Sequence, residues 1–237
     1  MEPEEIVMKK ILTLAVMAAL PLCSFAADKE GLNERLDKAK IVIDEIMHTP
    51  DKGIPDSVMR NATCVAVVPS LKKGALIVGA QYGQGVVTCK TGAGWSAPVF
   101  IRMIGGSYGL QIGGEGTDLV LVAVNDRGMQ DLLKSKFKIG ADAAAVAGPV
   151  GRTAEASTDW KLNAELLTYS RSKGLLVGIN LDGTSVSQNT EDTDLFYGVT
   201  HPTREILNGT VATPPDAAAF IATVSMYSRA SHDRAER

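Results

Sequence analysis

One serine in this chain has the spacing of a hydrolase nucleophile. Ser107 lies in Gly105-Gly106-Ser107-Tyr108-Gly109, which matches the G-x-S-x-G pattern. In that pattern the serine stands on a sharp turn from a strand into a helix, because the helix N-terminus helps to stabilise the oxyanion. The following GLQIGGEGTDLVLV is glycine-rich and then strand-like, so no helix is expected there. A hydrolase that uses Ser107 is therefore a remote alternative.

Metal chemistry is also weakly indicated. The histidines His48, His201 and His232 are isolated from one another, which does not favour a zinc site. Acidic residues gather in NTEDTD, residues 189–194, but this segment lacks the spacing and the glycine of a calcium loop. We expect a solvated acidic turn there. No catalytic residue, metal site or cofactor is predicted.

Helices are predicted near both ends of the chain. Apolar residues recur every three or four positions from Leu32 to Met47, which places them on one helix face, and Pro50 ends the pattern. Such a helix covers the core of its own domain, or alternatively lies on a membrane. The segment PPDAAAFIATVSMYSRA, residues 214–230, begins with proline and aspartate and continues as a second helix.

Short β-branched runs separated by glycine predict strands from Cys64 to Val124. Several glycines stand two apart, as Gly83 and Gly85 do, which puts them on one face of a strand. Either another backbone or ligand approaches this stripe closely, or the glycines mark bulges and bends of a curved sheet.

The rest of the chain is predicted as a mixture of helix and strand. Residues 128–138, GMQDLLKSKFK, look like a short helix, and the alanine-rich stretch 139–158 is ambiguous. Residues 164–183 predict two strands with a turn around Lys173 and Gly174.

The N-terminus has the pattern of an export signal. Lys9 and Lys10 precede the apolar run 11–22, and Ser24-Phe25-Ala26 supplies small residues for cleavage before Ala27. The run is short for a membrane span, which needs about 20 residues. We expect export to a bacterial periplasm.

The start of translation and lipidation are separate questions. The acidic opening MEPEEIV does not suit a signal, so translation is expected to begin at Met8. Lipidation at Cys23 is the less favoured alternative, because the bulky Leu22 precedes it.

Composition fits one globular domain, residues 27–237. The 237-residue chain is 45% apolar and 22% charged. Removal of residues 1–26 takes two of 24 basic and three of 27 acidic side chains, which leaves 22 and 24 and a net charge of −2. Nucleic acid is not an expected partner, because it needs a concentrated basic face.

Two cysteines remain after the signal is removed, Cys64 and Cys89. An even pair in an oxidising compartment favours a disulfide. Two buried free thiols on neighbouring strands are the alternative.

Four segments in order resemble the SYLF domain family, also described as Ysc-type lipid-binding domains. They are GWSAPVFIRMIGGSYGLQIGGEGTDLVLVAVN, FKIGADAAAVAGPVGR, AELLTYSRSKGLLVGINLDG and LFYG, and the likeness runs from Ile54-Pro55 to Gly198. The resemblance implies a non-enzymatic domain that binds lipid or associates with membranes. The family motif maps onto Trp95, Ser96, Pro98, Gly109, Gln111, Gly113, Gly148, Pro149, Gly151, Tyr169, Ser170, Arg171, Ser172, Gly174, Gly178, Gly183, Tyr197 and Gly198.

Together these features predict an α+β fold, with a glycine-rich, largely antiparallel sheet or barrel-like core and helices at both ends. The predicted ligand is a phospholipid or a membrane surface. The candidate contacts are Lys72 and Lys73 in an expected turn SLKKG, and Arg171 and Lys173 in YSRSKG. A structural or protein-interaction module of the cell envelope is the alternative.

Overall fold

The computed structural model describes residues 28–49, 53–75, 78–108, 116–150, 164–172, 175–176 and 179–229. The expected signal segment 1–26 lies outside these ranges, so the structure does not bear on export or on lipidation at Cys23. Further predicted site residues outside them are Gly109, Gln111, Gly113, Gly151, Lys173, Gly174 and Gly178. In the described ranges, no helix is long and apolar enough to cross a bilayer.

A ten-stranded sheet forms the centre of the fold, in the order β6-β10-β4-β2-β1-β5-β8-β7, with β3 beside β2 and β9 beside β8. Every described pairing between two of these strands is antiparallel except that of β7 with β8, which confirms the predicted sheet type. The strands are β1 (Cys64–Ala75), β2 (Val78–Thr91), β3 (Gly94–Trp95), β4 (Val99–Tyr108), β5 (Gly116–Ala123), β6 (Lys136–Lys138), β7 (Ala145–Ala147), β8 (Leu166–Ser172), β9 (Leu175–Leu176) and β10 (Ser185–Gln188).

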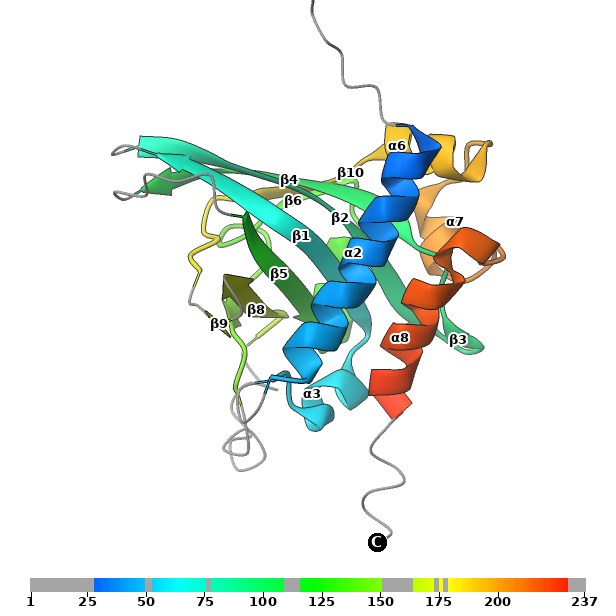
Figure 1. The fold of residues 1–237 in the computed structure, drawn as a ribbon, viewed down its shortest axis with the longest axis horizontal. Coiled ribbons are helices and arrows are strands. Elements are labelled where there is room, and N and C mark those ends of the chain that lie inside the picture. Colours follow the sequence, from blue (N-terminus) through cyan, green and yellow to red (C-terminus); the bar gives the residue numbers. More distant parts are fainter. Residues whose placement is uncertain are drawn as a thin grey trace, which may run out of the picture.

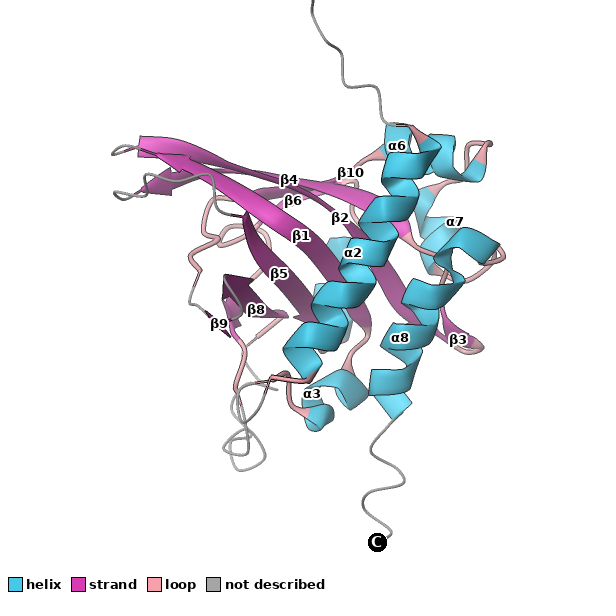
Figure 2. Ribbon diagram, viewed as in Figure 1, coloured by secondary structure: helices cyan, strands magenta, loops and turns pink. Residues whose placement is uncertain are grey.

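The sheet curls strongly, so that its two edges approach each other. Residues 139–144 alone separate the edge strand β6 from the opposite edge strand β7. Phe137 of β6 and Leu166 of β8 belong to the same buried cluster, although their strands lie near opposite ends of the sheet. This cluster therefore fills the inside of the curl, and the core is a half-barrel (Figure 2).

Helices cover the outer face of the sheet. The first, α2 (Lys29–Met47), crosses in front of β1 and β2 with α8 (Ala218–Arg229) beside it, and α3 (Asp56–Asn61) lies near their ends (Figure 1). Leu36 and Ile43 of α2 are buried in the outer cluster. The predicted helices at both ends are thus confirmed. The first helix covers the core of its own domain, as the first of its two interpretations predicted.

Four shorter helical segments complete the described part of the fold. They are α4 (Asp126–Leu132), α6 (Thr190–Tyr197), α7 (Thr203–Leu207) and a 3-10 turn (Pro215–Ala217). The helix expected over residues 128–138 is wrong in its second half, because residues 136–138 form β6. There Phe137 is buried and the lysines beside it are exposed, an alternation that suits a strand paired with β10.

The solvated acidic turn expected at residues 189–194 is also wrong. Asn189 caps α6, because its side-chain oxygen accepts a hydrogen bond from the nitrogen of Asp192 at 3.3 Å. Asp192 itself is buried. The segment is therefore the start of a helix packed on the sheet.

A bulge in β1 explains the glycine stripe. The pairing register of β1 with β2 shifts between Val67 and Lys72, and Ser70 in the shifted segment has a φ of 57°. A Cβ added to Gly85 would lie 2.1 Å from the carbonyl oxygen of Val67, so only glycine lets the bulged strand approach this closely. The expected turn at SLKKG is wrong, because β1 continues through it to Ala75.

Cys64 and Cys89 form a disulfide, as predicted. They lie directly opposite each other on β1 and β2, with their Cα atoms 4.0 Å apart. Lys90 donates its backbone N–H to the oxygen of Thr63 at 2.7 Å. The adjacent cysteines therefore occupy a non-hydrogen-bonded pair, where side chains lie closest.

Candidate functional site

A groove of about 370 Å³ lies between α2 and the bulged region of β1 and β2. We call it the α2 groove. It lies where the bulge holds the backbone of β1 away from the regular register. Its walls include Arg35 and Lys38 of α2, Ser70 and Lys72 of β1, and Tyr82 and Gln84 of β2.

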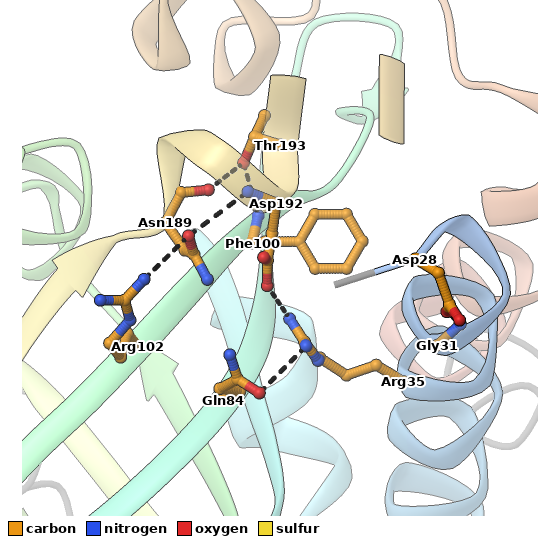
Figure 3. Close-up of polar contacts among 9 residues, drawn as sticks. All are labelled: Asp28, Gly31, Arg35, Gln84, Phe100, Arg102, Asn189, Asp192 and Thr193. Carbon is orange, nitrogen blue, oxygen red and sulfur yellow. Dashed lines mark hydrogen bonds and ion pairs between the residues drawn. The ribbon is translucent and has the colours of Figure 1, made fainter. Parts of the chain in front are cut away.

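A set of polar contacts adjoins this groove (Figure 3). We call it the polar ring, and it consists of Arg35, Gln84, Arg102, Asn189 and Asp192. Arg35 pairs with the carboxylate of Asp192 at 2.5 Å and donates to Gln84 Oε1 at 3.1 Å. Arg102 donates to Asn189 Oδ1 at 3.1 Å and lies directly opposite Gln84 on the neighbouring strand. The ring therefore joins α2, two strands and α6.

The ion pair in the ring is mostly withdrawn from water. The side chains of Arg35 and Asp192 are 14% and 5% exposed. The guanidinium also lies over the ring of Phe100, 5.4 Å from its centroid, which favours the cation. Because removal of one partner would leave a buried charge, this pair ties α2 to α6 and fixes the groove wall.

Two polar atoms of the ring have no hydrogen-bond partner among the described residues. Asn189 is 2% exposed, and its Nδ2 makes no hydrogen bond with the part of the chain that is described. The same holds for Nε of Arg102. Buried donors without an acceptor are rare in folded proteins, and Arg171 Nε is another such atom outside the ring.

The predicted lipid contacts do not gather in one place. Arg171 lies on β8, where its guanidinium pairs with Glu45 of α2 and with Asp118 of β5. Burial lowers the pKa of Lys73. Lys72 is exposed on the outer face, and Lys73 points to the opposite face because neighbouring strand residues alternate. Contact of any of these residues with lipid stays a prediction.

Sequence reasoning missed a second group of cations beside Lys72. Lys72, Tyr82 and Ile104 lie opposite one another on β1, β2 and β4, and the row continues through Ser185 to Lys138. A parallel row runs from Gln84 through Arg102 and Ser187 to Lys136. We call this surface the open face and define it by Lys72, Tyr82, Arg102, Ile104, Lys136 and Lys138.

The open face combines positive charge with exposed apolar side chains. Tyr82 and Ile104 are 43% and 50% exposed. Lys136 and Lys138 are exposed, whereas Phe137 between them points into the curl. The alternation KFK could have indicated one strand, but only the register across four strand pairs brings these residues together.

Several family-motif residues serve packing around the disulfide and β3. Ser96 Oγ accepts a hydrogen bond from the nitrogen of Cys89 at 3.0 Å. Trp95 donates its indole N–H to Ser228 Oγ at 2.9 Å, and Tyr197 donates its hydroxyl to the oxygen of Pro98 at 2.8 Å. These residues hold α8 and α6 against the sheet.

Other motif residues define backbone shape. A Cβ on Gly148 would lie 2.1 Å from the ring of Tyr169, whose hydroxyl donates to the oxygen of Pro149 at 3.2 Å. Gly183 and Gly198 have φ values of 78° and 71°, which favour glycine. On β8, Ser170 is buried and Ser172 is half-buried. The described motif residues thus specify the fold and do not converge on one pocket.

The structure gives no support to a nucleophile at Ser107. Its backbone lies inside β4 and pairs with Gly79 of β2, whereas a nucleophile elbow needs a turn into a helix. The next described element is again a strand, β5. Among the described residues, no three His, Cys, Asp or Glu side chains are placed to hold a metal ion.

Comparison with known proteins identifies relatives of this chain. Residues 104–227 match the family model Ysc84, described as Las17-binding protein actin regulator. Protein YSC84 of Saccharomyces cerevisiae is 33% identical over 171 residues, which cover 70% of this chain and 36% of the relative. LAS seventeen-binding protein 3 of the same yeast is 34% identical over 173 residues, with coverages of 70% and 37%.

A vertebrate relative is similar to the same extent. SH3 domain-containing YSC84-like protein 1 of Mus musculus is 34% identical over 170 residues, which cover 71% of this chain and 50% of the relative. The chain therefore spans half or less of the length of these three relatives.

Proposed function

The chain belongs to the Ysc84 family, the SYLF-domain family that its sequence resembles, and on this premise we propose that it binds a phospholipid or membrane surface without catalysis. The observation that carries the proposal is the open face. Lys72, Arg102, Lys136 and Lys138 lie on one outer surface of the sheet, around the exposed Tyr82 and Ile104.

The charge on this surface is large enough to matter. A lysine or arginine close to an anionic membrane contributes about 1 kcal/mol, so four contribute on the order of 4 kcal/mol before losses. Among the nearby acids, Asp118 pairs with Arg171 and Glu34 pairs with Lys38. Asp142 accepts a hydrogen bond from the backbone nitrogen of Lys138 at 2.7 Å. The whole chain has a net charge of −3, but this face is locally cationic.

The exposed apolar residues fit the same ligand. A tyrosine presents an apolar ring and a polar hydroxyl, a combination that suits the boundary between headgroups and acyl chains. Ile104 lies directly opposite Tyr82 on the next strand. Together they supply an apolar centre within a cationic border.

Sedimentation with vesicles tests this proposal. Vesicles of phosphatidylcholine with graded fractions of phosphatidylglycerol are mixed with the chain that begins at Ala27. Binding should rise with the anionic fraction and fall as salt rises, because salt screens surface charge. Absence of binding at every composition would contradict the proposal.

The names of the relatives favour a second candidate, a module that binds protein partners. The family model and one yeast relative are named for binding to Las17 or LAS seventeen. For this chain the candidate is a structural or protein-interaction module of the cell envelope. Native mass spectrometry of protein from its own membrane fraction separates the two. Co-purified lipid supports the first candidate, and lipid-free protein bound to one envelope partner supports the second.

We also propose that the mature chain begins at Ala27 and works in a bacterial periplasm. The disulfide between Cys64 and Cys89 supports an oxidising compartment, because such bridges are rare in a reducing cytosol. Intact-mass measurement of native protein in each cell fraction tests this. A cytosolic protein that retains Met8 would contradict both the cleavage and the location.

A further inference from the structure

The α2 groove is the corner where α2 meets the open face. Glu34 and Lys38 are about one turn apart on α2, so they lie on the same side of that helix. Lys72 and Tyr82 lie opposite each other on β1 and β2, and both belong to the open face. All four residues line the groove. A molecule in the groove would therefore adjoin whatever the open face binds.

The wall behind these residues is held by contacts within the protein. Arg35 reaches from α2 to Gln84 on β2, as Figure 3 shows, and its guanidinium also pairs with Asp192. The charge of Arg35 is thus matched by a carboxylate of the chain itself. Arg35 and Gln84 line the groove without supplying an unmatched charge.

Three other charges of the groove are available to a ligand. Lys72 is exposed, and no acid in the described ranges pairs with it. Glu34 and Lys38 pair with each other at 2.8 Å, but their side chains are 64% and 57% exposed. Because water competes for such an exposed pair, the pair is weak and opens readily to a ligand. The groove therefore offers two cations and one anion.

This mixture of charges restricts the chemistry of the ligand. A phosphate group suits the two lysines, which stand on different walls, α2 and β1. A phosphate alone would place negative charge near Glu34 and compete with that carboxylate for Lys38. A primary ammonium on the same ligand can donate to Glu34, and the exposed ring of Tyr82 also favours a cation. The matching ligand carries both groups.

We propose that the α2 groove binds a phosphodiester headgroup that carries a primary ammonium, as in an ethanolamine phospholipid. Lys38 and Lys72 bind the phosphate, and Glu34 accepts hydrogen bonds from the ammonium. The proposal rests on the proposed function, because it specifies a headgroup of the membrane that the open face contacts.

The size of the groove fits a headgroup better than a whole lipid. Its volume of about 370 Å³ lies near the lower end of the range for ligand pockets, roughly 300–1,000 Å³. The acyl chains would stay in the bilayer, beside the exposed Tyr82 and Ile104. A soluble glycerophosphodiester has the same headgroup chemistry. The experiment therefore tests the soluble and the membrane-bound forms separately.

Two variants separate the two halves of the ligand. Glu34→Gln removes the carboxylate that accepts from the ammonium, and Lys72→Gln removes one cation that binds the phosphate. The matched controls are Asp37→Asn on α2 and Lys90→Gln on β2, which make the same changes of charge. Both control positions are exposed and lie outside the groove.

NMR titrations follow the backbone amides of Glu34, Lys38 and Tyr82 in the chain that begins at Ala27. The ligands are glycerophosphoethanolamine and glycerophosphoglycerol, a diester without an ammonium. The wild type should show saturable shifts and bind glycerophosphoethanolamine more tightly. Glu34→Gln should weaken binding of that ligand alone by about tenfold, and Lys72→Gln should weaken binding of both, as expected for a lost charge-assisted hydrogen bond.

The controls Asp37→Asn and Lys90→Gln should bind both ligands as the wild type does. Absence of a saturable shift with glycerophosphoethanolamine would overturn the proposal. Equal affinity of the wild type for the two diesters would also overturn it, as would an equal loss of affinity in Glu34→Gln and Asp37→Asn.

Vesicles identify the source of the headgroup. At a fixed fraction of phosphatidylglycerol, phosphatidylethanolamine replaces phosphatidylcholine. If the ligand is a lipid headgroup, binding should rise in the wild type and not in Glu34→Gln. Saturable binding of the soluble diester, with vesicle binding that this replacement does not change, would assign the groove to a soluble phosphodiester.

The same vesicles separate this site from the proposed function. Vesicle binding by a wild type whose groove amides do not respond to glycerophosphoethanolamine would overturn the groove site and leave the proposed function standing. Saturable binding of glycerophosphoethanolamine without vesicle binding would support the groove site and contradict the proposed function.

Discussion

The carboxylate of Asp118 pairs with the guanidinium of Arg171 at 2.9 Å, and the two residues lie directly opposite each other on β5 and β8. The other oxygen of Asp118 accepts a hydrogen bond from the nitrogen of Ser70 at 3.0 Å. Ser70 has a φ of 57°, which is costly for a residue other than glycine. The pair therefore holds the bulge that forms one wall of the α2 groove.

Replacement of Asp118 by alanine should lower the free energy of unfolding by about 2 kcal/mol. It would leave the half-buried Arg171 with Glu45 alone and remove the acceptor for Ser70. Urea unfolding measures the change. Asp37→Ala, at an exposed position of α2, is the control and should stay within about 0.5 kcal/mol of the wild type. Equal stability of the two variants would show that Asp118 does not hold the bulge.

Glycine at position 85 should be required and glycine at position 106 should not. A Cβ on Gly85 would lie 2.1 Å from the backbone oxygen of Val67, whereas one on Gly106 would meet nothing within 4 Å. Gly85→Ala should therefore destabilise by about 1–3 kcal/mol or prevent folding. Gly106→Ala should be neutral or slightly stabilising. Thermal unfolding compares them, and similar transition temperatures would be inconsistent with the close approach of β1.

Reduction of the disulfide should destabilise the chain that begins at Ala27. The bridge between Cys64 and Cys89 spans 25 residues, and closing such a loop contributes about 3 kcal/mol in the chain-entropy model. Denatured, unreduced protein should show no titratable thiol, and reductant should shift the urea midpoint. A double variant with alanine at both positions should have the same urea midpoint with and without reductant. Two free thiols before reduction would contradict the bridge.

Alkaline pH should weaken the fold through Tyr169. Burial raises the pKa of its hydroxyl above the usual value of about 10. The folded state thus keeps this proton where the unfolded state loses it, so the stabilisation is complete below about pH 10 and declines above it. Urea unfolding at about pH 8 and about pH 11 should show a smaller decline in Tyr169→Phe than in the wild type. An identical decline would mean that Tyr169 ionises normally in the folded protein.

Local patterns were sufficient to predict the end helices, the antiparallel sheet and the cysteine pair. Leu36 and Ile43 recur with the helical period on one buried face, and Cys64 and Cys89 lie on strand-like runs. Such features depend on neighbouring residues, so they can be read from the sequence.

The site could not be read in the same way, because it depends on register and on contacts between distant segments. The ring brings Arg35 to Asp192, residues that are 157 positions apart. Lys72 and Lys138 share the open face only because four strand pairings place them in one row. The helix predicted through Phe137 failed for a related reason, since pairing of β6 with β10 overrides local helix propensity there.

Vesicle sedimentation of charge variants tests the central claim most directly. The test variant replaces Lys72, Lys136 and Lys138 of the open face by glutamine. The matched control replaces Lys29, Lys90 and Arg204, exposed cations outside the open face, by glutamine and so has the same net charge. Arg102 is left intact because it belongs to the polar ring.

Wild type and control should bind phosphatidylglycerol vesicles alike. The open-face variant should lose most of that binding, because three contributions of about 1 kcal/mol each correspond to more than a hundredfold in affinity. All three proteins should unfold at nearly the same temperature. Undiminished vesicle binding by the folded open-face variant, or an equal loss in the control, would contradict the account.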